Sequence, residues 1–301
     1  MVVRDADPFL ALAREITKAE LDPGRRPPEP ERRVPVIGLT GTGGAGKSSL
    51  TDELVRRFLS HRHEPRVAVL CVDPTRRRTG GALLGDRIRF NSLKNPRAYL
   101  RSLATRGARG EISEALGAVI ATVQASGLFD VVFVETAGIG QGDSAIAELS
   151  DLSIYVMTAE YGAPSQLEKI EMLDYADVVV INKFTRRGSE DALRDVRKQV
   201  QRNRGAFTER PEDMPVFGTS AAHFNDAGVN ALYGYLAAEL DRRFELGWES
   251  EPPTGRRVTD PHQQIIPPGR ERYLSEISGA CREHRRWARE QAGVAADLEA
   301  P

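Results

Sequence analysis

Short apolar runs recur along the middle of the chain, and stretches with helical spacing separate them. Six of these runs predict strands, at Val34–Leu39, Val67–Val72, Val131–Glu135, Ile154–Met157, Val178–Ile181 and Val216–Gly218. Most of them are continuously apolar rather than alternating, which is typical of strands that are covered on both faces. A weaker run, "AYLRSLAT" at residues 98–105, is a candidate for an additional strand.

The intervals between the strands carry apolar residues at helical spacing. The predicted helices are Ser48–Leu59, Glu111–Ala125, Gln166–Tyr175, Asp191–Gln201 and Val229–Phe244. Strands that alternate with helices in this way favour a parallel sheet, because each crossover helix packs back onto a face of the sheet. We therefore expect an α/β fold with a mostly parallel sheet and helices on both of its faces.

The two ends of the chain depart from this alternation. In residues 5–20, Phe9, Leu12 and Ile16 share one face of a predicted helix, and a stretch rich in proline and charge follows it. Beyond Phe244, prolines interrupt the pattern before Tyr273–Leu298 resumes helical spacing. The expected organisation is an N-terminal helix and linker at 1–33, a core domain at 34–245, and a C-terminal linker with a helical arm at 246–301.

Composition narrows the class of protein. The chain has 301 residues, of which 40% are hydrophobic and 28% charged, with a net charge of -1. Nucleic-acid binding usually needs a basic excess, and a membrane span needs ~20 consecutive apolar residues; the sequence shows neither. Its two cysteines argue against a zinc or disulfide framework. No apolar signal-peptide core opens the chain, so we expect a cytoplasmic protein without nucleic-acid or membrane partners.

The stretch "GTGGAGKS", Gly41–Ser48, has the spacing G-x-x-x-x-G-K-[ST] and joins a predicted strand to a predicted helix. Its glycines let successive backbone N–H groups converge on phosphate oxygens, and the helix N-terminus adds a positive dipole end. Lys47 supplies a mobile charge to the β- and γ-phosphates, and the Ser48 hydroxyl is a ligand for Mg²⁺. The expected phosphate contacts are Gly43, Gly44, Ala45, Gly46, Lys47, Ser48 and Ser49.

A magnesium site also needs carboxylates, and ligands of open α/β sheets bind at the carboxyl ends of strands. Asp73 and Glu135 end two predicted strands, and Asp86 lies in the glycine-rich loop "GGALLGDRIRF". The usual pattern in nucleotide hydrolases is Asp-x-x-Gly; Glu135, one methylene longer, stands in the acidic position, with Gly138 as the glycine that senses the γ-phosphate. Gln141 is a candidate to position water. Each acid could instead be a helix cap or a loop carboxylate.

A base site is indicated by "VVVINKF", in which Asn182 and Lys183 end an apolar strand as in the GTPase pattern Asn-Lys-x-Asp. The aspartate of that pattern accepts two hydrogen bonds from guanine, whereas this chain has Thr185 there. The stretch "GTSAA" resembles the loop that meets the base oxygen, through Ser220 and Ala221. The sequence leaves the choice between guanine and adenine open.

"TGTGGAGKSSLTDELVRRF", "VDPTRRRTGGALLGDRIR", "ETAGIGQGD" and "FNDAGVN" together resemble the MeaB/ArgK family of P-loop GTPases, which are chaperones of methylmalonyl-CoA mutase, and within it the GTPase domain of fused isobutyryl-CoA mutases. The resemblance implies a P-loop NTPase fold, GTP or GDP and Mg²⁺ as cofactors, and slow GTP hydrolysis that a mutase accelerates. It places Asp73, Asp86 and Glu135 around the metal, and Asn182, Lys183 and Ser220–Ala221 at the base.

The same resemblance implies a partner. The family gates the loading and removal of adenosylcobalamin on a cobalamin-dependent acyl-CoA mutase, which we expect as a separate chain or as fused domains missing here. Two other interpretations stay open: a small-molecule or protein kinase of the ArgK type, and a nucleotide-binding scaffold with relaxed base specificity. Arg76–Arg78 is a candidate arginine lid or transition-state arginine, or a solvated loop. A homodimer is also open.

Overall fold

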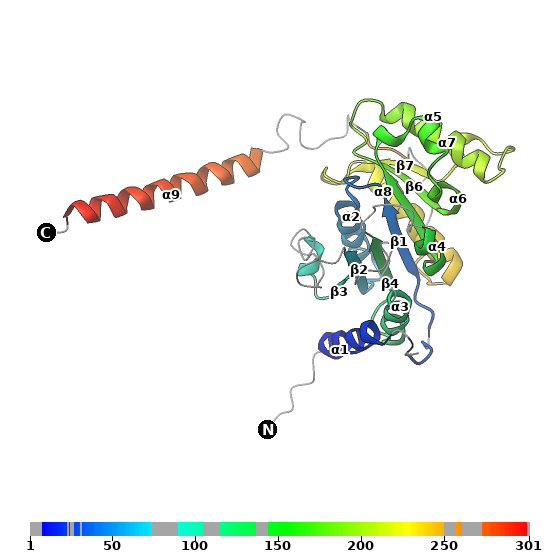
Figure 1. Ribbon diagram of the computed structural model, residues 1–301, viewed down its shortest axis with the longest axis horizontal. Coiled ribbons are helices and arrows are strands. Elements are labelled where there is room, and N and C mark those ends of the chain that lie inside the picture. The colour runs from blue at the N-terminus through cyan, green and yellow to red at the C-terminus, as the bar shows by residue number, and fades with distance from the viewer. Residues whose placement is uncertain are drawn as a thin grey trace, which may run out of the picture. The chain divides into compact units, whose positions relative to one another are not determined.

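The computed structural model describes residues 8–22, 24, 27–30, 32–73, 90–104, 115–136, 144–249, 257–260 and 273–299 (Figure 1). The chain divides into two compact units, Met1–Asp260 and Pro261–Pro301. Several predicted site residues lie outside the described residues, namely Asp86, Gly138, Gln141 and the run Arg76–Arg78. Asp73 is described as part of a strand, without its side chain.

The first unit is built on a seven-stranded sheet in the order β3-β2-β4-β1-β5-β6-β7. Every pairing between its neighbouring strands is parallel. The predicted strands are confirmed, including the weaker candidate at 98–105. The observed bounds are β1 Val36–Gly41, β2 Val67–Asp73, β3 Ala98–Ala104, β4 Val131–Thr136, β5 Leu152–Met157, β6 Val178–Asn182 and β7 Val216–Thr219.

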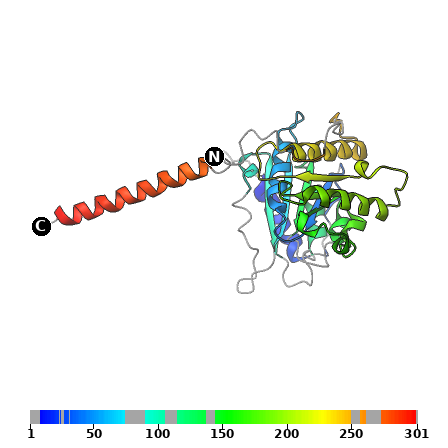
Figure 2. The same cartoon turned by 90° about the horizontal axis from the view of Figure 1, so that it is seen from above.

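Helices cover both faces of the sheet, as expected (Figures 1 and 2). Helices α2 and α8 pack on one face, and α1, α3, α6 and α7 pack on the other together with Ile146 of α4. The helices of the first unit are α1 Pro8–Leu21, α2 Lys47–Leu59, α3 Leu116–Ala125, α4 Ser144–Leu149, α5 Pro164–Leu167, α6 Met172–Tyr175, α7 Ser189–Asn203 and α8 Ala227–Phe244. Short 3-10 turns lie at η2 Ser92–Lys94, η3 Ala159–Tyr161 and η4 Pro211–Asp213.

Helices cover both faces of the sheet, which explains why apolar and polar residues do not alternate along the strands. In β2, Val67 and Val69 belong to the core beneath α2 and α8, while Ala68 and Leu70 belong to the core on the opposite face. Each is fully buried. Successive side chains of a strand point to opposite faces, so a strand between two helical layers has to be apolar at every position.

The N-terminal helix α1 is built into the first unit. Leu12 and Ile16 are buried in its core. The ring of Phe9 lies 5.5 Å from that of Tyr99 and 5.9 Å from that of Phe129, measured between centroids. The face of α1 that helical spacing predicts is therefore the face that packs against the core of the first unit.

One predicted helix is wrong. Gln166–Tyr175 is not continuous, because α5 ends at Leu167 and α6 begins at Met172. Between them the backbone bonds span three residues, as from Lys169 N–H to the Gln166 carbonyl at 3.0 Å. Leu167, Met172 and Leu173 are all buried in the same core, and packing these side chains there takes priority over helical propensity.

The second unit contains helix α9, Tyr273–Glu299. The helix predicted at Tyr273–Leu298 is thus confirmed. Its Trp287 side chain is exposed, with its ring stacked on that of His284 at 5.7 Å between centroids. Across the described part of the chain, no helix has both the length and the apolar character that crossing a bilayer would require.

Candidate functional site

The candidate site lies where the carboxyl ends of the central strands meet. Strand β1 lies between β4 and β5, and the chain reaches these two neighbours only after building β2 and β3 farther out. The strand order therefore reverses beside β1, which is where open α/β sheets bind their ligands. Glu135, Asn182 and Thr219 all stand at or next to the carboxyl ends of strands at this edge.

The glycine-rich turn after β1 needs glycine at two positions for steric reasons. Gly41 has φ +141°, and a Cβ there would lie 1.9 Å from the Val156 carbonyl oxygen. Gly46 has φ +88° and precedes α2 directly; a Cβ on it would lie 2.8 Å from Asn182 Nδ2. By contrast, a Cβ on Gly44 would meet nothing within 4 Å. The turn is thus fitted tightly against β5 and β6 while its tip faces open space.

Two lysine side chains fold onto carbonyl oxygens of this turn. The ammonium of Lys47 donates to the Gly41 carbonyl at 3.0 Å and lies 3.2 Å from that of Thr42. The ammonium of Lys183 donates to the Gly44 carbonyl at 2.6 Å. Neutral carbonyls are weaker partners for an ammonium than phosphate oxygens are, so both groups can transfer to a bound phosphate. Within the described residues, the buried Thr42 hydroxyl has no hydrogen-bond partner, which suits a turn shaped around a polar ligand.

Ser48 and Glu135 meet, as the sequence predicts. The Ser48 hydroxyl donates to Glu135 Oε1 at 2.5 Å. Thr51 Oγ1 lies 2.8 Å from Glu135 Oε2 and 3.0 Å from the Lys47 carbonyl. Glu135 is buried, and hydroxyl and carboxylate oxygens are the donors that Mg²⁺ prefers, so this pair fits the ion. Thr51 was not predicted; its place three residues after Ser48, on the same helix face, is the signal that could have found it.

Asn182 joins three segments of the site. Its Nδ2 donates to the Ala45 carbonyl at 2.8 Å, which fastens β6 to the glycine-rich turn. Its Oδ1 accepts from the Thr219 hydroxyl at 3.1 Å and from the Ala221 N–H at 3.2 Å. The side chain is only 2% exposed. The predicted base-site elements are therefore held against the predicted phosphate site by one buried amide.

The loop after β7 is shaped by Asp226, which was not among the predicted site residues. Asp226 Oδ2 accepts from the Ser220 N–H at 3.1 Å and from the Val229 N–H at 2.9 Å, so that it caps α8. The Thr259 hydroxyl lies 3.2 Å from the same oxygen. An aspartate just before a helix is a recognisable capping signal, whereas nothing in the sequence near Thr259 indicates that it returns to this loop.

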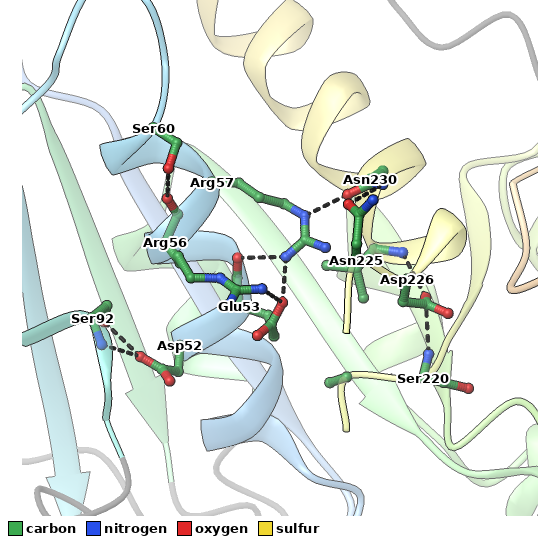
Figure 3. Close-up of polar contacts among 12 residues, drawn as sticks. Asp52, Glu53, Arg56, Arg57, Ser60, Ser92, Ser220, Asn225, Asp226 and Asn230 are labelled. Carbon is green, nitrogen blue, oxygen red and sulfur yellow. Dashed lines mark hydrogen bonds and ion pairs between the residues drawn. The ribbon is translucent and has the colours of Figure 1, made fainter. Parts of the chain in front are cut away.

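A polar network between α2 and α8 supports this loop from outside (Figure 3). Arg57 Nε donates to Asn230 Oδ1 at 2.7 Å, and Asn230 Nδ2 donates to Asn225 Oδ1 at 3.0 Å. Arg57 also forms an ion pair with Glu53 at 2.6 Å. Sequence reasoning missed this network because charged and amide residues are ordinary on exposed helix faces.

A second contact of α2 supports the segment that precedes β3. Asp52 accepts from the Asn91 N–H at 3.1 Å, and from the Ser92 N–H and hydroxyl at 2.9 and 2.6 Å (Figure 3). Ser92 opens the short turn η2. Helix α2, which begins at the phosphate turn, is therefore anchored to two other segments of the first unit.

Thr185 has no carboxylate that could accept hydrogen bonds from a nucleotide base. The turn that carries it is fixed by the Phe184 N–H donating to the Thr219 carbonyl at 2.9 Å and the Arg186 N–H donating to the Lys183 carbonyl at 3.0 Å. The Thr185 side chain is exposed.

The structure brings together Lys47, Ser48, Glu135, Asn182, Lys183 and Ala221 around the predicted turn Gly43–Gly46. Ser220 directly precedes Ala221 and donates its N–H to Asp226, and Ser49 directly follows Ser48 with its side chain exposed.

The chain is similar to known proteins over most of its length. The model of the family described as methylmalonyl Co-A mutase-associated GTPase MeaB matches residues 29–240. The chain is 54% identical over 268 residues to a fused isobutyryl-CoA mutase of Geobacillus kaustophilus, covering 89% of this chain and 24% of that protein. It is 56% identical over 267 residues to that of Nocardia farcinica, covering 88% and 25%. The chain thus spans about a quarter of these relatives.

Three other proteins, one matched by sequence and two by structure, are similar to the chain at lower identity. A putative GTPase of Pyrococcus horikoshii is 41% identical over 156 residues, covering 52% of this chain and 48% of that protein. A solved LAO/AO transport system kinase has a TM-score of 0.50 at 19% identity, covering 97% of this chain and 87% of that one. HypB from Helicobacter pylori, solved with nickel, has a TM-score of 0.51 at 15% identity, covering 79% and 97%. These two structures support the fold alone. With its parallel sheet, its glycine-rich phosphate turn and the match over residues 29–240, the chain belongs to the MeaB family of P-loop GTPases.

Proposed function

We propose that this chain binds GTP with Mg²⁺, hydrolyses it slowly, and through its nucleotide state gates the loading and removal of adenosylcobalamin on a cobalamin-dependent acyl-CoA mutase. One observation carries the nucleotide part: Asn182 holds the base-side loop against the phosphate turn, next to the Ser48–Glu135 pair. The mutase part is supported by relatives named as fused isobutyryl-CoA mutases.

The residues of the phosphate turn have distinct tasks in this proposal. Lys47 leaves the loop carbonyls and neutralises the β- and γ-phosphates. Ser48 Oγ and Glu135 Oε1 would hold Mg²⁺. The ion would supply positive charge to offset the negative charge that builds up during phosphoryl transfer. The N-terminus of α2 and the N–H groups of the turn bind the remaining oxygens.

The base-side residues orient the nucleotide. Asn182 sets the position of Ala221, whose N–H can be shared with a base oxygen, and Lys183 lies along the tip of the turn at Gly44. Asp73, Asp86, Gly138 and Gln141 remain candidates for metal binding, γ-phosphate sensing and water positioning. A transition-state arginine from Arg76–Arg78 and a homodimer are further elements of the proposal.

The test is a hydrolysis assay on the chain alone and with a cobalamin-dependent acyl-CoA mutase. We expect slow phosphate release alone and a clear acceleration when the mutase is present. Transfer of adenosylcobalamin to the apo-mutase should depend on whether GTP or GDP is bound. Fast hydrolysis that no mutase alters would contradict the proposal.

Product analysis separates this function from the kinase interpretation. A GTPase releases inorganic phosphate, whereas a kinase leaves a phosphorylated acceptor. We expect all of the γ-phosphate to be recovered as inorganic phosphate.

One observation favours a second candidate, a nucleotide-binding protein with relaxed base specificity. Thr185 stands where a carboxylate would select guanine, and its neutral hydroxyl cannot accept two hydrogen bonds as strongly. Dissociation constants for GTP and ATP, measured side by side, distinguish this candidate from a guanine-specific switch.

A further inference from the structure

The loop that follows β7 is held together by contacts between its two ends. We call residues 220–226 the base loop. Asn225 has φ +52°, in the left-handed region that asparagine adopts more readily than most residues other than glycine. The next residue, Asp226, is buried and accepts a hydrogen bond from the Ser220 N–H. The start of the base loop is therefore positioned by its end, and that end contains the left-handed residue Asn225.

A chain of side-chain hydrogen bonds reaches Asn225 from another element. Asn230 Nδ2 donates to Asn225 Oδ1 at 3.0 Å, and Arg57 Nε donates to Asn230 Oδ1 at 2.7 Å (Figure 3). Arg57 is in turn held by Glu53, through the Oε2 carboxylate oxygen at 2.6 Å and the backbone carbonyl at 2.9 Å. The side chains of Arg57 and Glu53 are only 10% and 16% exposed, so solvent competes little for the bonds between them, whereas Asn225 and Asn230 are exposed.

Helix α2, which carries Arg57, relates this connection to the phosphate turn. Helix α2 begins at Lys47, directly after the phosphate turn. Asn182 joins the turn to the base loop through Ala45 and Ala221 on the inside of the site. Arg57 joins α2 to the same loop through Asn230 of α8. These two hydrogen-bonded connections between the phosphate-binding and base-binding parts add to the apolar core that α2 and α8 share.

We propose that Arg57 is a positioning residue for nucleotide binding: through Asn230 and Asn225 it holds the base loop at the correct distance from the phosphate turn. This inference rests on the proposed nucleotide-binding function and deepens it. Arg57 contributes to the affinity for the base and leaves the affinity for the phosphates unchanged, because it lies eleven residues after Gly46, the last residue of the turn.

The guanidinium geometry makes the role specific to arginine. Arg57 uses Nε for Asn230 and another nitrogen for Glu53, which requires two donors in a fixed planar arrangement. A lysine has one ammonium on a flexible stem and cannot reproduce that arrangement. Arg242 provides a matched control: it pairs with Glu239 at 2.7 Å in the last turn of α8, and its side chain is 67% exposed. Arg56 is unsuitable as a control, because its guanidinium lies 5.8 Å from the ring centroid of Phe224 in the base loop.

The experiment measures dissociation constants for GTP and for inorganic tripolyphosphate, both with Mg²⁺, by isothermal titration calorimetry on the full chain. Variants are Arg57→Ala, Arg57→Lys, Asn230→Ala and the control Arg242→Ala. We expect the first three to weaken GTP binding about five- to tenfold, as for one lost hydrogen bond, with unchanged tripolyphosphate binding. Arg242→Ala should bind both ligands as the wild type does.

Two further variants test the relay itself. Asn230→Asp keeps an acceptor for Arg57 but loses the amide donor to Asn225, so it should weaken GTP binding as much as Arg57→Ala does. The double variant Arg57→Ala/Asn230→Ala should be no worse than either single variant, since both break one chain of contacts. Asn230 is exposed, so its variants remain informative if Arg57→Ala fails to fold.

The outcomes are distinguishable. Equal weakening of GTP and tripolyphosphate binding would show that Arg57 supports the fold of the turn and would overturn the inference. Wild-type affinity in the Arg57 and Asn230 variants would overturn it as well. A wild-type chain that binds tripolyphosphate but no GTP or GDP would instead refute the proposed function.

Discussion

The Ser48 hydroxyl donates a hydrogen bond to Glu135 Oε1 at 2.5 Å, across 87 residues of sequence. Ser48 is the second residue of α2, the helix after the phosphate turn, and Glu135 is the next-to-last residue of strand β4. A buried carboxylate is stabilised by such donors, and here it is also placed beside the hydroxyl expected to bind Mg²⁺. The fold itself thus brings together the two groups of the proposed metal site.

Replacing Glu135 with glutamine tests this site. The amide oxygen still accepts from Ser48, so the fold is retained, but the negative charge that attracts the cation is gone. We expect the Mg²⁺ concentration for half-maximal GTP hydrolysis to rise about 10–100-fold, the range for disrupted metal-site partners. Thr51→Val is the control, because it removes a hydroxyl next to Glu135 without changing charge. An Mg²⁺ dependence in Glu135→Gln equal to that of the wild type would contradict the assignment.

Two glycines of the phosphate turn should respond differently to alanine. Gly46→Ala introduces strain at φ +88° and a Cβ 2.8 Å from Asn182 Nδ2, whereas Gly44→Ala introduces strain at φ +73° alone. We expect Gly44→Ala to lower the free energy of unfolding by ~1 kcal/mol and Gly46→Ala by clearly more, since strain and steric conflict add. Urea unfolding without nucleotide measures both. Equal losses would mean that Asn182 does not constrain the turn.

The wild type should discriminate only weakly between GTP and ITP (inosine triphosphate). A carboxylate at residue 185 should restore a preference for GTP. Without a carboxylate at residue 185, the 2-amino group that distinguishes GTP from ITP has no charged acceptor, so their dissociation constants should agree within about threefold. Thr185→Asp should favour GTP over ITP about 10–100-fold, as hydrogen bonds to a charged group are worth ~1.5–3 kcal/mol. Thr185→Val should leave the ratio unchanged. A wild type that already prefers GTP strongly would show that another group reads the base.

The stability of the fold should depend on pH near neutrality. Burial, the neighbouring charge of His63 and that of Arg62 lower the pKa of His61, against a smaller opposing effect of Asp241. The folded protein therefore binds this proton less readily than the unfolded chain, whose histidine has a pKa of ~6.5. The contribution of His61 to stability is present above that value and is lost as the pH falls below it.

Urea unfolding between pH 7.5 and 5.5 checks this sign. We expect the free energy of unfolding to fall over the interval, and to fall less in His61→Gln, which cannot titrate. The ring of His61 lies 5.2 Å from that of Trp248, so the variant has a lower stability at every pH; only the slope is diagnostic. Identical slopes would rule out His61 as the source.

Much of the framework could be predicted from local patterns. The strands follow from continuous apolar runs, because a strand covered on both faces cannot tolerate polar side chains. The phosphate turn follows from its glycines and from the lysine and serine at the helix start, because each supplies a backbone conformation or a group that phosphates require. Asn182 and Lys183 were predicted in the same way, from their place at the end of a strand.

Other features depended on packing between distant segments. The division of residues 166–175 into two short helices follows from burying Leu167, Met172 and Leu173 together, which outweighs the helical pattern of the segment. The bond from Arg57 to Asn230 spans 173 residues and that from Asn182 to Ala45 spans 137.

The sequence by itself therefore determined most of the strands and helices, their parallel arrangement and the residue types of the phosphate turn, since these depend on residues within a few positions of one another. Only the tertiary structure decided that Asn182 fastens the base side to that turn, that Asp226 and Thr259 shape the base loop, and that Arg57 supports it from α2. Such contacts depend on how whole helices and strands dock, and docking is set by the shape of the buried core rather than by any local pattern.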